Sequence, residues 1–255
     1  MEAYLADITE NGALRVAGAD AERFLQVMCA GDLAGCSAVG GLSQGAFLTA
    51  QAEVIDIVSV LRTGDDEFLL TGSADNRAEL FAWLSAHAGL ADDAGAVFPD
   101  LSVEDASSQL GILLMAGAGA RRAHEELAAA CAGRVFFIEH EFDAPAYGVP
   151  RVPCWMLFFP VNLAAEVGEF LSAYPEFYVL DAAELVELLE ERGAYLPYIH
   201  EAAYADAHDG AFVPYLRRGD GFVGAHALGR HAEGILDKVE SSQTDVAPAA
   251  PSGGC

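Results

Sequence analysis

Apolar and polar positions alternate along some stretches of the chain and recur at helical spacing along others. Leu14 and Val16 alternate with small or polar neighbours, as in a half-buried strand. Phe24, Leu25 and Met28 then fall on one side of a predicted helix. This strand and helix are too short to be stable alone, so we expect them to pack on a sheet formed by later residues. The pattern therefore predicts an α+β protein.

The same patterns predict two lobes with a similar order of elements. Asp20 and Ser73 stand where the N-caps of the first two helices belong, and the second helix is expected to run to about His87. A loop rich in glycine and acids, 89–99, separates the lobes. Strands are predicted at 46–49, 54–61, 67–71, 101–104, 109–115, 134–141 and 154–159, and further helices at 118–130 and 163–172.

A further helix is expected after the second lobe. Asp181 and Glu184 have the spacing of a capping box, and Gly193 is expected to end the helix that they begin. The last residues are rich in proline, serine and glycine, which is typical of a disordered tail. The predicted segments are a first lobe (1–95), a second lobe (96–178), a return segment that completes the core (179–240) and a tail (241–255).

The composition adds a strong negative charge. The 255 residues carry a net charge of −26, and Lys238 is the only lysine. Nucleic acid and anionic membranes are therefore not expected as partners, because no basic stripe is present to replace condensed counterions. The acidity itself fits a GC-rich genome or a high-salt habitat, or alternatively an acidic docking face.

The start of the chain and the cysteines predict a cytoplasmic location. Acidic residues stand where a signal peptide carries positive charge. No apolar run approaches the roughly 20 residues that span a bilayer. The five cysteines are odd in number and form no Cys-x-x-Cys pair, so neither a disulfide framework nor a thiolate zinc site is predicted.

Two motifs carry weak signals for a cofactor. Gly117 and Gly119 follow an apolar strand, with Glu139 about twenty residues on, which imitates a dinucleotide-binding unit without its third glycine. A plain strand-to-helix turn is the interpretation we prefer. Histidines also gather near the end of the chain, but no pair has the spacing of two ligands on one helix face, so no metal site is predicted. These histidines are His200, His208, His226 and His231.

Asp56 stands out in the β-branched run from Val54 to Val60. A carboxylate is costly to bury in such a strand unless it is hydrogen-bonded. In one interpretation, the alternation of the strand places Asp56 on a solvent face. In the other, Asp56 faces a cleft, where its ionisation can be tuned for catalysis.

Taken in order, several motifs resemble the aminomethyltransferase family, which includes the T-protein of glycine cleavage and its folate-binding relatives. Residues 18–26 read Gly-Ala-Asp-Ala-Glu-Arg-Phe-Leu-Gln, which is similar to the family's G-x-D-A-x-x-F-L signature. Val54-Ile55-Asp56 resembles its G-x-I-D-D-L strand. The likeness covers about residues 5–230 in the right order. Further matches are Gly31-Asp32-Leu33, Glu191-Arg-Gly193, Tyr198-Ile-His-Glu201 and Phe222-Val-Gly-Ala-His-Ala-Leu228.

The resemblance implies a fold of two interleaved α+β lobes with tetrahydrofolate held in a central opening. It also implies a C-terminal barrel, for which this chain is too short, so we expect a core-only member of the family. A partner protein that completes the barrel would fit this expectation.

The chain departs from the family at the position credited with catalysis. The second aspartate of the family's strand corresponds to Ile57, and Asp56 matches only the first. An aromatic residue expected about a dozen positions earlier is replaced near Gln44, and an expected asparagine corresponds to Ser73. The loss of the aspartate argues against the ordinary glycine cleavage reaction.

The resemblance also implies a set of functional residues. Glu191 matches the acid that holds the pterin ring, although a shift of register would give this role to Glu190. Tyr198 and His200 are expected near the same pocket, and Ser73 is a further expected contact of the cofactor. Asp56 is the acid predicted to carry the catalytic role.

Three functions follow as hypotheses. The first is a tetrahydrofolate-dependent transferase of methyl or aminomethyl groups, whose donor would be a carrier protein or a methylated corrinoid protein. The second is a non-catalytic folate-binding accessory protein on the same scaffold. The third is an interaction subunit that has lost folate altogether.

Overall fold

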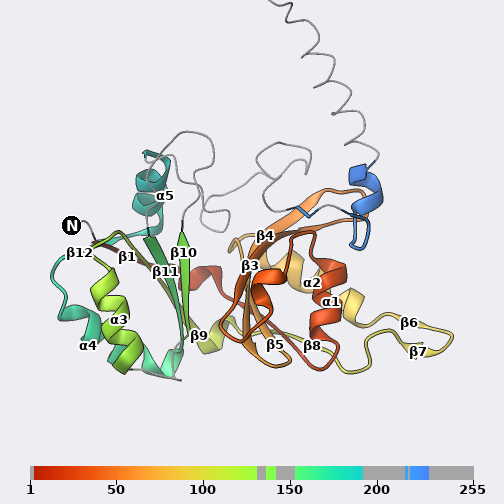
Figure 1. Cartoon of the computed structure of the whole chain (residues 1–255), viewed down its shortest axis with the longest axis horizontal. Helices are drawn as coiled ribbons and strands as arrows, with labels where there is room; N and C mark the ends of the chain where they lie inside the picture. Colours follow the sequence, from red (N-terminus) through yellow and green to blue (C-terminus); the bar gives the residue numbers. More distant parts are fainter. Residues whose placement is uncertain (1–2, 131–135, 142–152, 192–215, 218, 230–255) are drawn as a thin grey trace, which may run out of the picture.

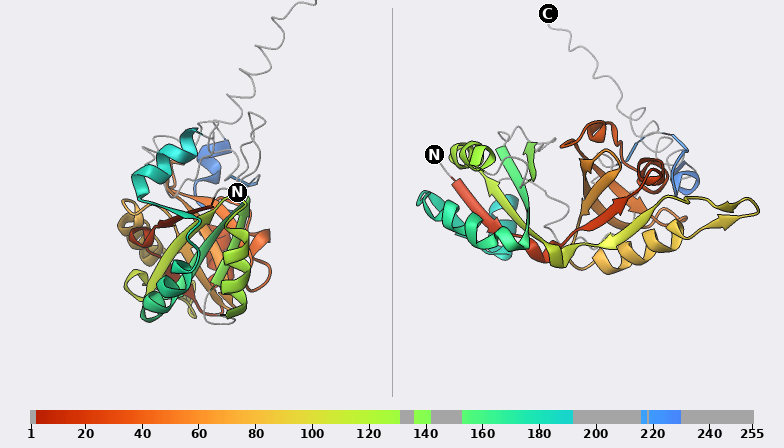
Figure 2. Two further views of the ribbon diagram at one scale, coloured as in Figure 1. Left: turned by 90° about the vertical axis from the view of Figure 1, so that its left-hand side faces the viewer. Right: turned by 90° about the horizontal axis from the view of Figure 1, so that it is seen from below.

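The computed structural model describes residues 3–130, 136–141, 153–191, 216–217 and 219–229. In this part of the chain, two five-stranded sheets face each other in the middle of the molecule (Figures 1 and 2). Helices lie against the outer face of each sheet, so the layers run helix, sheet, sheet, helix (Figure 1). The α+β class predicted from the sequence is confirmed.

The first sheet, called the β4 sheet below, is antiparallel throughout. Its longest strand contains the β-branched run, and β-branched residues favour extended backbone. Helices α1 (Ala21–Met28) and α2 (Arg77–Ala88) cover its outer face and bury their apolar sides there. In order across the sheet, the strands are β3 (Leu42–Leu48), β4 (Val54–Gly64), β5 (Glu67–Thr71), β2 (Leu14–Ala17) and β8 (Ser102–Asp105).

The second sheet, called the β9 sheet, is mixed. Its β1 and β12 strands pair in parallel, and all its other neighbours are antiparallel. Helices α3 (Arg121–Ala130) and α4 (Ala164–Ser172) cover its outer face, and α5 (Ala182–Glu191) follows β12. In order across the sheet, the strands are β10 (Phe136–Glu141), β11 (Pro153–Pro160), β9 (Leu110–Ala116), β1 (Ala3–Asp7) and β12 (Phe177–Leu180).

The two lobes exchange strands. The first strand of the chain, β1, lies in the β9 sheet between β9 and β12. The strand β8, which the sequence assigned to the second lobe, instead pairs with β2 at the edge of the β4 sheet. Strand patterns report which residues are extended but not which edge they join, so this assignment was wrong. The exchange gives the interleaved arrangement that the family resemblance implied.

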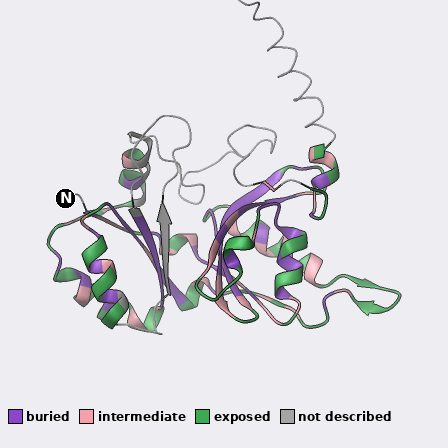
Figure 3. Cartoon of the chain, viewed as in Figure 1, coloured by how far each residue is buried: buried purple, intermediate pink, exposed green. Residues whose placement is uncertain are grey.

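A buried cluster joins the inner faces of the two sheets. Leu61 and Leu69 of the β4 sheet pack there against Ile112, Leu114 and Phe158 of the β9 sheet. Figure 3 shows the central strands β4, β5, β9 and β11 as largely buried, whereas the outer sides of the helices are exposed. Each sheet therefore contributes one face to a shared core and the other face to its own helices.

The predicted helix caps are partly confirmed. Asp181 and Glu184 form the capping box, because each carboxylate accepts a hydrogen bond of 2.9 Å from the backbone N–H of the other residue. Asp20 makes no side-chain cap of α1, and its carboxylate instead accepts bonds from the Arg23 side chain and the Asp100 backbone. The predicted cap by Ser73 is also wrong, because α2 begins only at residue 77.

Short elements complete the described chain. A small hairpin of β6 and β7 projects away from the body of the molecule (Figures 1 and 2). None of the helices in the described ranges is long and apolar enough to cross a membrane. The hairpin strands are β6 (Ala91–Asp92) and β7 (Gly95–Ala96), and four 3-10 turns lie at Thr9–Asn11, Ala34–Cys36, Ser107–Gln109 and Val161–Leu163.

Candidate functional site

The two neighbouring residues Asp56 and Ile57 lie on opposite faces of the β4 sheet. Successive side chains of a strand point to opposite sides, and paired residues share a side. Asp56 is paired with Phe47, which belongs to the core beneath α1 and α2. Ile57 is paired with Ala46 on the inner face, where it packs with Phe222. The position at which the resemblance implies a catalytic aspartate is therefore a buried isoleucine.

Three polar side chains lie in line on the inner face, across β3, β4 and β5. Gln44 is paired with Ser59, and Ser59 with Thr71. The Gln44 Nε2 donates to Ser59 Oγ at 3.2 Å, and Thr71 Oγ1 donates to the carbonyl of Gly12 at 2.8 Å. Ser59 and Thr71 are buried, whereas Gln44 is half-buried. We call Gln44, Ser59 and Thr71 the polar row.

The sequence reasoning missed the polar row. Gln44 was noted only as the replacement of an aromatic residue, and neither Ser59 nor Thr71 was named. No local pattern identifies the row, because register shifts between Arg62 and Gly64 and between Phe47 and Leu48 interrupt regular counting from either turn.

Asp56 is completely buried, with 0% of its surface exposed. Its Oδ1 accepts a hydrogen bond from the backbone N–H of Ile57 at 2.9 Å, and its Oδ2 accepts one from that of Ser73 at 3.1 Å. Burial raises the pKa of Asp56 to about 7, although these bonds and one from the Asn76 side chain act in the opposite direction. The interpretation of Asp56 as a solvent-facing residue is wrong, because the helix layer covers this face of β4.

Ser73, a predicted cofactor contact, lies in the loop between β5 and α2. It is buried, with 7% of its surface exposed. It lies beyond the last residue of β5, Thr71, and its backbone N–H is the group that meets Asp56. The structure therefore brings Ser73 and Asp56 together through the backbone N–H of Ser73. The side chain of Asp56, the predicted catalytic acid, lies on the opposite face of β4 from that of Ile57.

The remaining predicted contacts cannot be placed beside these two. Glu191 is the last residue of α5, and Glu190 precedes it, but only their backbone is described. Tyr198 and His200 lie outside the described residues. Their predicted roles at a pterin site stay predictions.

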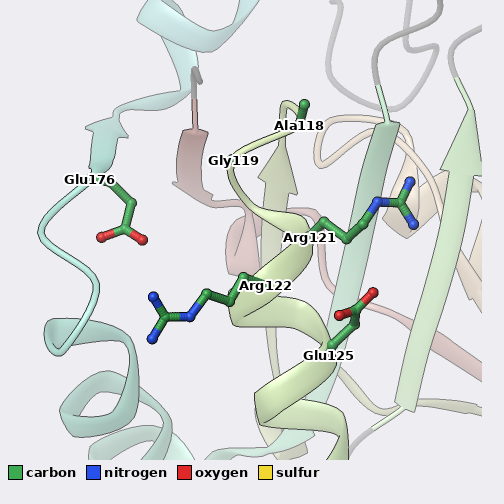
Figure 4. Close-up of a pocket in the computed structure, with 6 residues that line it drawn as sticks. All are labelled: Ala118, Gly119, Arg121, Arg122, Glu125 and Glu176. Carbon is green, nitrogen blue, oxygen red and sulfur yellow. The ribbon is translucent and has the colours of Figure 1, made fainter.

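The glycine motif after β9 forms a tight turn into α3. Gly117 has a positive φ of 93°, and its carbonyl accepts a bond from the N–H of Ala120 at 3.0 Å. The adjoining pocket has a volume of about 400 Å³, and in Figure 4 its two arginines point in opposite directions. The Arg122 side chain, which extends toward Glu176, is paired with Glu126 at 2.8 Å. The lining residues are Ala118, Gly119, Arg121, Arg122, Glu125 and Glu176.

This pocket agrees with the plain strand-to-helix interpretation of the motif. Its lining holds as many acids as arginines, so it offers no net positive charge to a dinucleotide phosphate. Metal ligands do not gather either: no group of three or more suitable side chains occurs among the residues that the structure describes. Of the four histidines in the last quarter, His226 is exposed, and the others lie outside the described ranges.

Comparison with known proteins identifies the class to which this fold and site belong. The family model described as the GCVT N-terminal domain matches residues 1–139. The chain belongs to this family.

Several curated relatives carry the name aminomethyltransferase. One from Geobacillus thermodenitrificans is 29% identical over 125 residues, which is 49% of this chain and 32% of the relative. Another from Bacillus cereus is 26% identical over 192 residues, covering 75% of this chain and 47% of the relative. The chain thus spans about half or less of the length of these relatives.

A solved structure shares the fold. The glycine cleavage system aminomethyltransferase T from Bartonella henselae superimposes with a TM-score of 0.73 at 18% sequence identity. The match covers 91% of this chain and 64% of that one. The predicted fold, two interleaved lobes of the aminomethyltransferase type, is therefore confirmed.

Proposed function

We propose that the protein binds tetrahydrofolate and transfers a one-carbon unit, methyl or aminomethyl, in the manner of the T-protein family. The observation that carries this proposal is the polar row on the inner face of the β4 sheet, in a chain whose fold and family are those of aminomethyltransferases. The resemblance implies that tetrahydrofolate lies in a central opening, and we place that opening beside Gln44, the half-buried end of the row.

The residues of the inner face fit such a ligand. An amino-pyrimidinone edge needs hydrogen-bond donors and acceptors beside an apolar wall. Gln44 supplies a half-buried carboxamide with both, and Leu42, also half-buried and two positions before it on the same face of β3, supplies an apolar neighbour. When bound, tetrahydrofolate supplies the nitrogen that accepts the one-carbon unit. The side chains of this chain orient it and exclude water from its apolar side.

The donor of the one-carbon unit is part of the same proposal. A carrier protein or a methylated corrinoid protein would present the unit at the inner face. The acidic surface of the chain, with its net charge of −26, favours a donor protein whose docking face is basic.

One specific observation favours a second candidate, a non-catalytic folate-binding accessory protein. The catalytic position implied by the resemblance is Ile57, and Asp56 lies on the opposite face with no exposed surface. A side chain on that face reaches neither the polar row nor a ligand beside it. The catalytic role predicted for Asp56 would therefore require a rearrangement of β4.

Calorimetric titration with tetrahydrofolate under anaerobic conditions tests ligand binding, which both candidate functions require. We expect binding in the micromolar range, weakened about tenfold by Gln44→Ala, because a carboxamide that bonds the ligand is lost. Ser43→Ala is the matched control, since Ser43 lies next to Gln44 in β3 but on the other face of the sheet. An absence of heat and of thermal stabilisation at millimolar ligand would contradict both candidates.

A transfer assay then separates the two candidates. Formation of 5-methyl- or 5,10-methylene-tetrahydrofolate from a methylated corrinoid protein or an aminomethyl carrier protein would support the transferase. Tight binding without transfer from either donor would support the accessory protein.

A further inference from the structure

The carboxylate of Asp56 takes the place of sheet hydrogen bonds where the ladder between β4 and β5 ends. The last paired residues of the ladder are Ser59 and Thr71, but β4 extends on to Val54. Beyond the last pair, Asp56 Oδ2 accepts the N–H of Ser73 at 3.1 Å. One side chain of β4 therefore holds the loop that follows β5 against the strand.

The lack of a side chain at Gly72 leaves room for this carboxylate. A Cβ atom at Gly72 would lie 2.2 Å from Asp56 Oδ2 and 2.8 Å from the Cγ1 of Val58. Both distances are shorter than real contacts, so any side chain at this position would displace the carboxylate or the loop. The close approach of the loop to Asp56 thus depends on glycine.

The other side of the same loop is tied to the crossover between the two sheets, which is the segment from β1 to β2. The carbonyl of Gly72 accepts a bond from Asn11 Nδ2 at 2.8 Å. Thr71 Oγ1 donates to the carbonyl of Gly12 at 2.8 Å, and Gly12 has the positive φ of 63° that this turn requires. Arg77, at the start of α2, donates to the carbonyls of Glu10 and Asn11 at 2.6 and 2.9 Å.

We propose that Asp56 is a positioning residue that anchors the β5–α2 loop, and that through this loop it sets the place of Ser73 and of the crossover at residues 10–12. The part of this proposal that concerns ligand rests on the proposed function, because it takes Ser73 as a contact of tetrahydrofolate. The anchoring of the loop is independent of any ligand.

Three features distinguish this role from catalysis. Asp56 has no exposed surface, and each of its oxygens accepts a backbone N–H. Its side chain lies on the helix-covered face, away from Ile57 and the polar row. A carboxylate in these surroundings can order a loop without touching the reacting atoms.

Amide hydrogen exchange in the ligand-free protein tests the anchor. In Asp56→Asn, only one oxygen remains to accept two N–H groups, so we expect exchange at Ser73 or Ile57 to accelerate at least tenfold relative to core amides. Val16→Ala is the matched control, because Val16 is equally buried in the same core but lies away from the loop. It should lower protection generally, without singling out these two amides. Unchanged protection of both amides in Asp56→Asn would overturn the proposal.

Tetrahydrofolate affinity provides the second readout. We expect Asp56→Asn and Ser73→Ala each to weaken binding, and the double variant to be no weaker than the worse single one, since both act through one contact. Additive losses, or unchanged affinity in Asp56→Asn, would overturn the positioning of Ser73. If the wild-type protein binds no tetrahydrofolate, the proposed function fails, and the exchange result still decides whether Asp56 anchors the loop.

A second variant covers the case in which Asp56→Asn does not fold. Asn11 is only half-buried and holds the Gly72 carbonyl from the opposite side of the loop. We expect Asn11→Ala to accelerate exchange at Ser73 more than at core amides. If exchange at Ser73 in this variant accelerates no more than exchange at the core amides, the loop is not anchored as proposed.

Discussion

Asp56 orders a loop through its hydrogen bonds, but the burial of its charge lowers the stability of the folded protein. Its backbone bonds hold the β5–α2 loop, yet its burial makes the charged form costly. The net result is a pKa raised from 3.8 to about 7. The folded protein therefore binds a proton that the unfolded chain releases between these two values.

Asp56 is consequently expected to make the protein less stable as the pH rises from about 4 to about 7. Between the two pKa values, the stabilisation contributed by the bound proton falls by about 1.4 kcal/mol per pH unit, and above the folded pKa it is lost. Asp56→Asn cannot ionise and lacks this slope. The measurement is the free energy of unfolding in urea across this range for both proteins. Parallel pH profiles would contradict the raised pKa.

The fit between Gly72 and Asp56 gives a second prediction at the residue scale. Gly72→Ala should destabilise the protein by about 2 kcal/mol or more, because the added methyl group overlaps a buried carboxylate. Gly168→Ala is the control: Gly168 lies inside α4 with open space around its Cβ position, so this change should stabilise by about 0.5–1 kcal/mol. Chemical denaturation measures both. Equal effects of the two substitutions would contradict the close approach at Gly72.

Elements were predictable from the sequence wherever local chemistry decided them. The apolar spacing of α1 and the β-branched run of β4 were sufficient to identify a helix and a strand. Properties that depend on distant residues were not predictable in this way. The burial of Asp56 depends on helices that pack over β4, and the position of β8 depends on an open edge of β2. The polar row was missed for the same reason, since it exists only once three strands are in register.

The capping box is the local signal with the clearest consequence for the candidate site. Asp181→Ala should cost about 1 kcal/mol and fray the first turn of α5, because it leaves the N–H of Glu184 without its acceptor. Hydrogen exchange of the α5 amides measures the effect. If Glu191 at the end of this helix holds the pterin, the affinity for tetrahydrofolate should fall as well. Asp181→Ser, which retains a capping oxygen, is the conservative control and should restore most of the protection.

At the scale of the whole molecule, the strand exchange and the shared core make the two lobes one structural unit. The strand β1 lies in one sheet and β2 in the other, only a few residues apart. The buried cluster between the sheets includes Leu61 and Leu69 from one side and Ile112 from the other. Neither sheet can lose its partner without exposing this inner face to water. The interleaved family fold could be expected from the resemblance, but the residues that join the lobes required the structure.

The lobes are therefore expected to unfold together, and the two tryptophans of the chain can test this directly. Trp83 lies in α2 over the β4 sheet, and Trp155 lies in β11 of the β9 sheet, where it is fully buried. Trp155→Phe and Trp83→Phe each leave a fluorescent reporter in one lobe. Because each substitution also changes the stability, the comparison is made within each variant, between its fluorescence and its far-ultraviolet circular dichroism. We expect one coincident urea transition in both variants, as in a two-state protein.

A lobe whose fluorescence changes at a lower urea concentration than the circular dichroism would show that the sheets separate before they unfold. The core between them would then be too weak to hold the inner face of the β4 sheet in one position for a ligand.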